Sequence, residues 1–349
     1  MSLPQINLDH LHGLSVLPFG AFSKNTSLVS LNFSEHPNLE IVSTNCFYQA
    51  WSLRELNLGP YIEKIDKKAF FECTSLQRLD LSNCTSLKNI GINAFENCYS
   101  FREIIFPSNS RITKFGCNAF QYCKSLQRLD LSNCTNLLNI ENYVFKSCYS
   151  LREIIFPVNS RIKEIIYGAF ESCTSLEILD LSNCTSLVNI GTIAFKDCYS
   201  LREIIFPVNS RIREIYCVAF KNCTSLVRLT IPASVAKINY DTFSYCTQLE
   251  EVIFEGQTEI NKYAFQNCPR LTIKKLFRLP GFHYGKYSEL RTILVDSQQE
   301  NGTCGISLEE FEEDSNIVVI LPCKHAYFEE IFHEWFLRKK ICPTCKAKL

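Results

Sequence analysis

The sequence lacks an excess of charge of either sign, because 36 lysines and arginines balance 36 aspartates and glutamates. A neutral chain has no bulk electrostatic attraction to nucleic acid or to an anionic membrane, so neither is expected as a partner. No window approaches the roughly 20 apolar residues that a membrane-spanning helix needs. The first seven residues have no basic region and no continuous apolar run, so we expect no secretory signal. A cytoplasmic protein is the expectation, with the nucleus as the alternative compartment.

Cysteine is abundant, with 19 residues, yet its positions are not those of a secreted disulfide framework. Nine of them recur at one place in the repeat, three residues after a phenylalanine. We favour the interpretation that they are small buried thiols at a packing position, and a series of disulfides is the alternative. Free thiols fit a reducing, intracellular setting.

Internal repetition is the strongest signal in the chain. A phenylalanine, usually preceded by alanine, recurs every 22 to 25 residues, and runs such as Leu76-Gln-Arg-Leu79-Asp-Leu81 follow the cysteine. This L-x-x-L-x-L pattern predicts a strand that points its apolar positions into a solenoid, because one repeat cannot bury its apolar side alone. The recurring phenylalanines are Phe22, Phe47, Phe70, Phe95, Phe120, Phe145, Phe170, Phe195, Phe220, Phe243 and Phe265.

The array resembles leucine-rich repeats of the BspA type, in which Ala-Phe-x-x-Cys-x-x-Leu is the recurrent signature. The resemblance covers roughly Leu14 to Leu276. It implies an α/β repeat solenoid with a parallel strand in each repeat, which serves binding and not catalysis. We divide the chain into a solenoid of about eleven repeats over residues 1–276, a cap and linker over 277–303, and a small zinc-binding RING-like module over 304–349.

A period of fifty lies above the period of twenty-five, because Leu-Asp-Leu-Ser-Asn-Cys segments alternate with Glu-Ile-Ile-Phe-Pro segments. The exposed strand positions form rows in which opposite charges on adjacent strands can pair, each pair contributing roughly 0.2–1 kcal/mol. One interpretation is a solvated, self-compensating surface, and the other is a docking surface for an extended or repetitive protein target. The candidate target-binding residues are Arg78, Asp80, Glu103, Ile105, Arg128, Asp130, Glu153, Ile155, Asp180, Glu203, Ile205 and Arg228.

The last fifty residues carry a different signal. Cys323-x-His325 is followed, after sixteen residues, by Cys342-Pro-Thr-Cys345. Four ligands at this spacing match a structural zinc site, whose fully occupied coordination leaves no position for an activated water. We therefore expect no catalytic residue on this chain. A module of about fifty residues has too small a core to be safely stable alone, and a structural metal commonly supplies the deficit.

The residues around these ligands extend the pattern. Cys304-Gly-Ile306-Ser307-Leu-Glu-Glu-Phe311 precedes them, and Trp335-Phe lies between the two ligand pairs. Over about the last 46 residues the chain resembles the RING finger of ubiquitin ligases. A RING finger binds two zinc ions, and the resemblance gives a complete ligand set for only one of them. That set is Cys323, His325, Cys342 and Cys345, whereas the other ligand positions fall on Cys304, Ser307, Phe328 and Ile331.

Only one residue of the second set is a ligand type, so we predict one zinc ion, with a small hydrophobic cluster in place of the other. The resemblance also implies a groove for a ubiquitin-conjugating enzyme, contacted by Ile306, Trp335 and Pro343. The position after the last ligand is often an arginine that steadies the bound ubiquitin. Here it is Lys346, which keeps the charge but lacks the planar fork of donors.

These features favour a RING-type ubiquitin-protein ligase, in which the repeats bind a target and the C-terminal module recruits the conjugating enzyme. Such a ligase acts mainly through proximity and forms no covalent intermediate on its own chain. The alternative is a non-enzymatic interaction scaffold with a structural zinc tail, which the lost ligands and Lys346 favour. SUMO ligation is a third class, suggested only by the one-zinc pattern.

Overall fold

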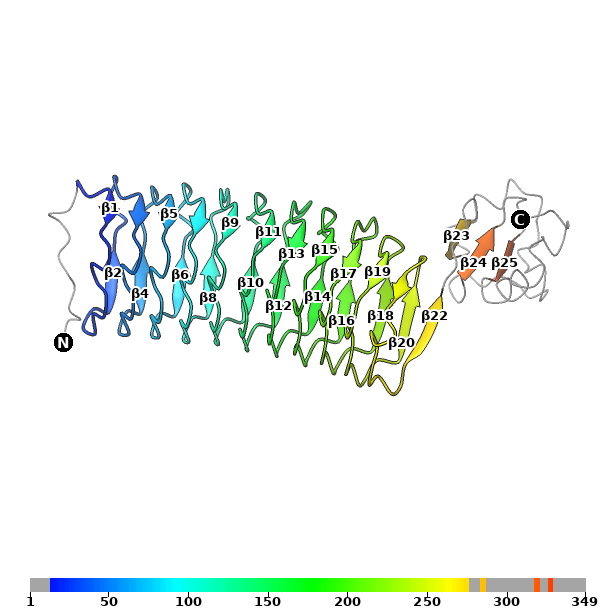
Figure 1. The fold of residues 1–349 in the computed structure, drawn as a ribbon. Helices are drawn as coiled ribbons and strands as arrows, with labels where there is room; N and C mark the ends of the chain where they lie inside the picture. The colour runs from blue at the N-terminus through cyan, green and yellow to red at the C-terminus, as the bar shows by residue number, and fades with distance from the viewer. Residues whose placement is uncertain (1–12, 276–282, 287–316, 321–325, 329–349) are drawn as a thin grey trace. The chain divides into compact units, whose positions relative to one another are not determined.

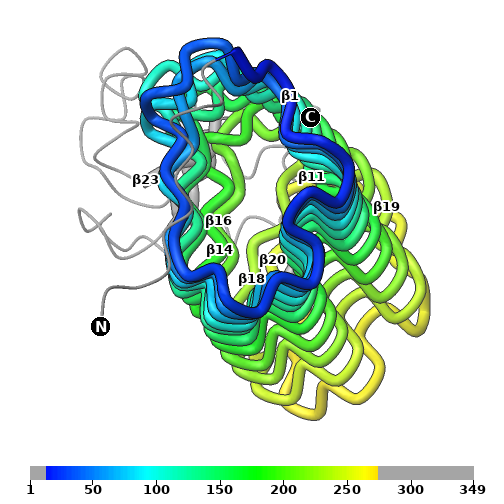
Figure 2. Tube along the Cα trace, turned by 90° about the vertical axis from the view of Figure 1, so that its left-hand side faces the viewer, coloured from blue at the N-terminus to red at the C-terminus, as the bar shows by residue number. Residues whose placement is uncertain are grey.

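The computed structural model describes residues 13–275, 283–286, 317–320 and 326–328. The chain divides into two compact parts, Met1–Lys275 and Leu276–Leu349. The first part is a solenoid of stacked coils, in which each turn repeats the outline of the turn before it with a progressive offset (Figures 1 and 2). Within the described ranges, no helix is long and apolar enough to cross a membrane.

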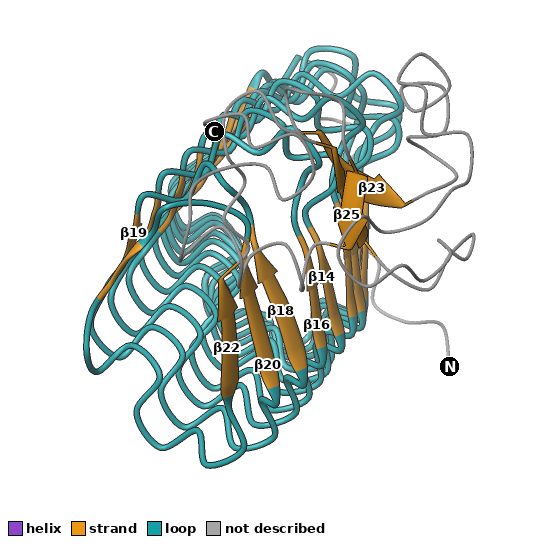
Figure 3. Cartoon of the chain, turned by 90° about the vertical axis from the view of Figure 1, so that its right-hand side faces the viewer, coloured by secondary structure: helices purple, strands orange, loops and turns teal. Residues whose placement is uncertain are grey.

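Each coil contributes two short strands, one to each of two parallel sheet systems that run along the solenoid (Figures 1 and 3). The first system consists of β1 (Val16–Leu17), β3 (Ile41–Val42), β5 (Lys64–Ile65), β7 (Asn89–Ile90), β9 (Lys114–Phe115), β11 (Asn139–Ile140), β13 (Glu164–Ile165), β15 (Asn189–Ile190), β17 (Glu214–Ile215), β19 (Lys237–Ile238) and β21 (Glu259–Ile260). The second system, called the strand face below, consists of β2 (Ser30–Asn32), β4 (Glu55–Asn57), β6 (Arg78–Asp80), β8 (Glu103–Ile105), β10 (Arg128–Asp130), β12 (Glu153–Ile155), β14 (Ile178–Asp180), β16 (Glu203–Ile205), β18 (Arg228–Ile231), β20 (Glu251–Phe254) and β22 (Thr272–Lys275).

Alternation along each strand explains which side chains enter the core. In β6 the middle residue, Leu79, is buried while its two neighbours point outward, as the two-residue period of a strand requires. The predicted solenoid with a parallel strand in each repeat is therefore confirmed. Each coil also adds the second short strand, and turns form the remainder of the coil, with no helix in the described ranges.

A continuous stack of phenylalanine rings fills the solenoid. All eleven recurring phenylalanines take part, from Phe22 to Phe265, with neighbouring ring centroids 4.9–5.4 Å apart and ring planes within 11° of parallel. Stacking of this kind adds to the stabilisation that ring burial itself provides. The sequence period therefore predicts the ladder residue by residue.

The recurring cysteines form a second ladder beside the rings. The Cys73 thiol donates to the Phe47 carbonyl oxygen at 3.1 Å, and Cys173 donates to Phe145 at 3.3 Å in the same way. All fifteen cysteines in the described ranges are free, and twelve of them are buried. The interpretation as small buried thiols is confirmed, and each of the nine thiols that follow a ladder phenylalanine by three residues also donates to a backbone carbonyl of the preceding coil. We call this pair of ladders the Phe–Cys side.

Two positions in each coil from Phe22 to Phe243 have a left-handed backbone, two residues before and two residues after the ladder phenylalanine. Around Phe220 these positions are Val218, with φ of 63°, and Asn222, with φ of 63°. Asparagine and glycine tolerate this conformation, whereas a β-branched residue is strained in it. The chain nevertheless places Ile193 and Val218 there, because the hydrogen bonds and packing of the neighbouring coils impose the turn.

The second compact part contains a three-stranded antiparallel sheet among its described residues. Its strands are β23 (His283–Lys286), β24 (Ile317–Ile320) and β25 (Ala326–Phe328), with β24 in the middle. Ile320 of β24 is paired with Ala326 of β25, so five residues connect the two strands. That connection contains Cys323 and His325, the first pair of predicted metal ligands.

Candidate functional site

The strand face brings the predicted target-binding residues together in rows. Arg78 lies opposite Glu103 and Asp80 lies opposite Ile105 across β6 and β8. The same register recurs from β10 to β12 and from β14 to β16. The charged members at the first strand position are exposed, while the isoleucines at the third position are half-buried or exposed. The predicted rows are therefore present, and their role in target binding stays a prediction.

Opposite charges on this face pair across neighbouring strands. Arg128 Nε lies 2.9 Å from Glu153 Oε2, and the same guanidinium lies 3.2 Å from Asp130 Oδ2. Arg78 makes the equivalent contacts in the preceding coils, to Glu103 and Asp80. Because these side chains are about half-exposed, each pair contributes little stability, in the range of about 0–1 kcal/mol.

The aspartates of this row also stabilise a turn. The Asp130 carboxylate accepts a hydrogen bond from the backbone N–H of Ser132 at 3.0 Å. Partial burial alone would raise the pKa of Asp130, but the hydrogen bonds from Ser132 and the charge of Arg128 outweigh burial and lower it. Asp80 has a lowered pKa for the same reasons, through Ser82 and Arg78. These carboxylates are therefore anionic at neutral pH.

Breaks in the hydrogen bonding delimit two-coil units in the middle of the strand face. The N–H of Arg102 donates to the Gln77 carbonyl at 2.8 Å, within the unit that contains β6 and β8. By contrast, the N–H of Gln127 reaches the Arg102 carbonyl only at 3.4 Å, and in the described ranges no ladder joins β8 to β10 or β12 to β14. The period of fifty in the sequence thus corresponds to the separate pairs β10–β12 and β14–β16, whereas β6 and β8 end a four-stranded sheet that begins at β2. We number these units one (β6 and β8), two (β10 and β12) and three (β14 and β16).

A cleft opens at each of two of these gaps. The cleft between units one and two has a volume of about 500 Å³, and the cleft between units two and three has a volume of about 450 Å³. The first is lined by Arg102, Glu103, Ile104, Ile105, Phe106, Gln127, Arg128, Asp130 and Asn133. The second is lined by Arg152, Glu153, Ile154, Ile155, Phe156, Glu177, Ile178, Asp180, Asn183 and Ile205.

Sequence reasoning found part of this lining and missed the rest. Glu177 and the two asparagines were not among the predicted residues, because they lie outside the central strand positions. A comparison of the three units column by column would have singled out Glu177 and Ile178, the positions where unit three departs from the other two. The gaps themselves depend on small displacements between coils, which the residue pattern does not encode.

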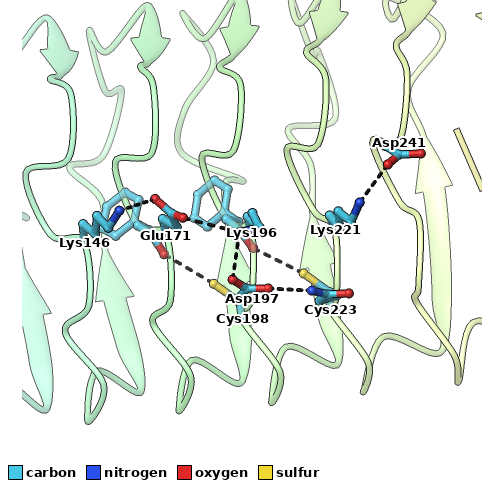
Figure 4. Close-up of polar contacts among 11 residues, drawn as sticks. Lys146, Glu171, Lys196, Asp197, Cys198, Lys221, Cys223 and Asp241 are labelled. Atoms are coloured by element: carbon cyan, nitrogen blue, oxygen red, sulfur yellow. Dashed lines mark hydrogen bonds and ion pairs between the residues drawn. The ribbon is translucent and has the colours of Figure 1, made fainter.

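The Phe–Cys side carries a row of charged residues that the sequence analysis did not identify (Figure 4). Glu171 is only 8% exposed and lies between two lysines, with Lys146 Nζ at 2.8 Å and Lys196 Nζ at 3.6 Å. Lys221 forms a similar pair with Asp241 at 2.8 Å. The repeat contains this signal, since Lys146, Glu171, Lys196 and Lys221 each occupy the position directly after a ladder phenylalanine.

This charged row links coils and has no evident chemistry. Burial alone would lower the pKa of Lys196, but the hydrogen bond from its ammonium to Asp197, with the charge of Glu171, outweighs burial and raises it. Lys196 is therefore held as a cation, and its charge is balanced. Among the described residues, no group of three or more histidine, cysteine, aspartate or glutamate side chains is arranged to hold a metal ion.

The predicted metal and enzyme-binding residues lie outside the described residues. These are Cys323, His325, Cys342 and Cys345 for the metal, and Ile306, Trp335, Pro343 and Lys346 for the conjugating enzyme. What the structure adds is the pairing of β24 with β25 on either side of the first ligand pair. Three thiolates and one imidazole are a donor set that suits tetrahedral zinc.

Comparisons with protein families account for both parts of the chain. Residues 2–127, 84–186 and 163–277 match the model described as "BspA type Leucine rich repeat region". Residues 302–346 match the model described as "Ring finger domain". A RING finger implies zinc binding.

Curated relatives match the C-terminal region alone. The E3 ubiquitin ligase BIG BROTHER-related of Arabidopsis thaliana is 35% identical over 57 residues, which are 16% of this chain and 16% of that protein. The E3 ubiquitin-protein ligase Godzilla of Drosophila melanogaster is 36% identical over 73 residues, or 21% of this chain and 13% of that protein. The chain thus spans less than a fifth of the length of these two relatives.

Among solved structures, a leucine-rich repeat protein from Bacteroides ovatus is 23% identical, with a TM-score of 0.47, and the alignment covers 77% of each chain. At this TM-score the fold assignment rests on the repeats themselves and on the family model.

Proposed function

We propose that this chain, which belongs to the family of BspA type leucine-rich repeat proteins, is a RING-type ubiquitin-protein ligase. The observation that carries the proposal is the RING finger match over residues 302–346, in which Ile306, Trp335 and Pro343 accompany the metal ligands. Metal ligands alone would fit many zinc modules. These three residues occupy the positions that contact a ubiquitin-conjugating enzyme in the RING resemblance.

The C-terminal module would hold one zinc ion through Cys323, His325, Cys342 and Cys345. The ion supplies folding free energy to a module with little core of its own, and its four protein ligands leave no coordination position for water. The β24–β25 pairing supports this assignment, since it brings together the two ends of the segment that carries Cys323 and His325. Phe328, at the end of β25, lies where the resemblance places a ligand of the second zinc ion. A phenyl ring cannot coordinate zinc, so one ion is proposed.

In this proposal the solenoid and the module act by proximity. The strand face binds the target, and the groove beside Trp335 binds a conjugating enzyme that carries ubiquitin on its own cysteine. Bringing the two reactants together converts a bimolecular transfer into an effectively intramolecular one. Lys346 contributes a positive charge toward ubiquitin but lacks the planar fork of donors that an arginine has. We therefore expect a slower transfer of ubiquitin than with arginine at that position. The cytoplasm is the proposed compartment.

Ubiquitin transfer in vitro tests the proposal. The full chain is assayed with a panel of conjugating enzymes, beside Trp335→Ala and Cys342→Ser, and zinc is measured by elemental analysis. We expect transfer with at least one enzyme, loss of transfer with retention of zinc in Trp335→Ala, and loss of both in Cys342→Ser. Transfer at full rate in Trp335→Ala would refute the mechanism.

A second candidate function is a non-enzymatic interaction scaffold with a structural zinc tail. The specific observation in its favour is that Ser307, Phe328 and Ile331 occupy ligand positions of the RING resemblance. Silence across the whole panel of conjugating enzymes, with one zinc ion per chain, would support the scaffold and not the ligase.

A further inference from the structure

Unit three of the strand face differs from units one and two at two neighbouring positions. The segment before the buried leucine reads Gln77-Arg78 in unit one and Gln127-Arg128 in unit two, but Glu177-Ile178 in unit three. The following strand reads Arg-Glu-Ile-Ile-Phe-Pro in all three units. The units are otherwise nearly identical here, so units one and two serve as a reference within the same chain for the two changes in unit three.

The two changes alter the charge of the face. Units one and two each present two arginines and two carboxylates on their paired strands, and their charges cancel. Unit three presents one arginine, Arg202, with three carboxylates, Glu177, Asp180 and Glu203. The replacement of an arginine by an isoleucine removes the cation that pairs with both carboxylates in the other units.

The ion pairs follow this change. Arg78 and Arg128 each contact the aspartate of their own strand and the glutamate of the next. At the equivalent place in unit three, no ion pair joins Asp180 or Glu203 to another residue within the described part of the chain. Glu177 does pair with Arg202, at 3.5 Å between half-exposed side chains. Asp180 accepts a hydrogen bond from the backbone N–H of Ser182 at 2.8 Å, but it has no ion-pair partner at this place and is available to a cation from another molecule.

The cleft beside unit three combines these carboxylates with an apolar surface. Ile155, Ile178 and Ile205 line it together with Glu177 and Asp180. In the neighbouring cleft, Arg128 and Gln127 occupy the places of Ile178 and Glu177. Both clefts lie in the same register and have similar volumes, so they differ in chemistry more than in shape.

We propose that the cleft between β12 and β14 is the recognition site for the target, and that it binds a polypeptide segment in which an aliphatic side chain lies beside a lysine or arginine. The aliphatic side chain would pack on the three isoleucines, where removing apolar surface from water favours binding. The cation would pair with Asp180 and Glu177, which gives specificity for basic over acidic segments. This inference deepens the proposed function, and it rests on that function for the identity of the ligand as a ubiquitination target.

The test exchanges the two differing residues between unit three and the other two units. In the reversion variant, Glu177→Gln and Ile178→Arg restore in unit three the residues that units one and two already carry, so the solenoid should fold as before. In the transfer variant, Gln127→Glu and Arg128→Ile introduce the same pair into unit two. Thermal unfolding of both full-length variants checks that the fold is retained.

A random twelve-residue peptide library displayed on phage is the probe. It is selected on the full-length wild-type chain, and the enriched peptides are synthesised for affinity measurements on all three proteins. We expect enrichment of peptides with an aliphatic residue within two positions of a lysine or arginine. We expect their affinity to fall at least tenfold in the reversion variant, and the transfer variant to bind them at a second site.

Several outcomes would overturn the proposal. These are an absence of enrichment, enrichment of acidic peptides, or equal affinity for the wild type and the reversion variant. A wild-type chain that dimerises through this face, while the reversion variant stays monomeric, would make a second copy the occupant and would also overturn it. Size-exclusion chromatography with light scattering separates that case.

The result is independent of the ligase test, because peptide binding needs no conjugating enzyme. Ubiquitin chain formation by the reversion variant, measured without a target, should equal that of the wild type. Peptide binding without any ubiquitin transfer would refute the ligase and keep the cleft. Transfer without peptide discrimination would keep the ligase and refute the cleft.

Discussion

The Phe–Cys side and the strand face differ in burial and in continuity, although the same coils form both. On the Phe–Cys side the ladder rings from Phe47 to Phe220 are fully buried and stack at a nearly constant distance. On the strand face unit three departs from units one and two at Glu177 and Ile178, and gaps interrupt the hydrogen bonding. The difference indicates that stability is concentrated where buried rings and thiols stack without interruption. Recognition can therefore change on the strand face at little cost to the fold.

Alkaline pH should break the Phe–Cys side most severely. Burial holds the pKa of Cys73 and Cys173 well above that of an unfolded thiol, which titrates near ~8.5. Stability is therefore complete below about pH 8.5 and falls as the pH rises above it, by ~1.4 kcal/mol per pH unit for each such thiol, because only the unfolded chain releases the proton. Urea midpoints at pH 7.5, 9 and 10 measure the effect.

Eight buried ladder thiols make the expected loss large, and one variant tests its origin. In Cys173→Ala the slope of stability against pH should be smaller by one thiol. An unchanged urea midpoint between pH 7.5 and pH 10 would contradict the assignment of these thiols as titrating only on unfolding.

Removing one ring from the ladder should have the next largest effect. Phe170 is fully buried between Phe145 and Phe195, with ring centroids 5.4 and 5.2 Å away. Phe170→Ala should lower the free energy of unfolding by about 3–5 kcal/mol, because it removes a ring and leaves a cavity. Phe19→Ala is the control, since that ring is 71% exposed and its loss should change stability only slightly. Chemical denaturation compares the two variants.

A stabilising change should be available on the same side. Val218 has a left-handed backbone, which costs a β-branched residue roughly 1–2 kcal/mol. Val218→Asn should therefore raise stability by about 1 kcal/mol, since asparagine adopts this conformation more readily. Val227→Asn provides the comparison, because Val227 is not among the residues with positive φ and should gain nothing. Equal effects at the two positions in thermal unfolding would show that strain is not the cause.

The smallest effect is expected on the strand face. Arg128→Ala removes both ion pairs of a guanidinium that is about half-exposed, so stability should fall by about 0.5 kcal/mol or less. The effect should shrink as salt is added, because exposed pairs are screened. A loss approaching that of Phe170→Ala would remove the contrast between the two sides.

The sequence predicts the parts of this structure that depend on burial. The eleven ladder phenylalanines, the buried cysteines and the register of the charged rows all follow from the repeat, because apolar periodicity dictates which side chains face inward. The pattern did not predict the thiol-to-carbonyl hydrogen bonds or the left-handed turns. These depend on how one coil sits on the next, and several side chains are compatible with each turn.

For the candidate site, the sequence predicted the rows and not the clefts. Arg78, Glu103 and their equivalents occupy the expected places. The gap between β12 and β14 arises from longer hydrogen bonds between units, such as that from Glu177 N–H to the Arg152 carbonyl at 3.5 Å. The lengthening of these hydrogen bonds depends on how neighbouring coils pack on one another, and the sequence of a single repeat does not specify that packing. The zinc and enzyme-binding residues stay predictions, because they lie outside the described residues.

The gaps between the strand pairs also bear on how such a chain can evolve. A duplication or deletion of fifty residues between the breaks at β8–β10 and β12–β14 would leave the hydrogen-bonded strand pairs of the strand face intact. Each added copy would bring its own cleft in the same register. Two substitutions such as those at Glu177 and Ile178 could then specialise that copy while its neighbours kept the older surface. The unit of duplication in this protein would then be the pair of coils. Each duplicated pair of coils would add one cleft, and with it one further binding partner.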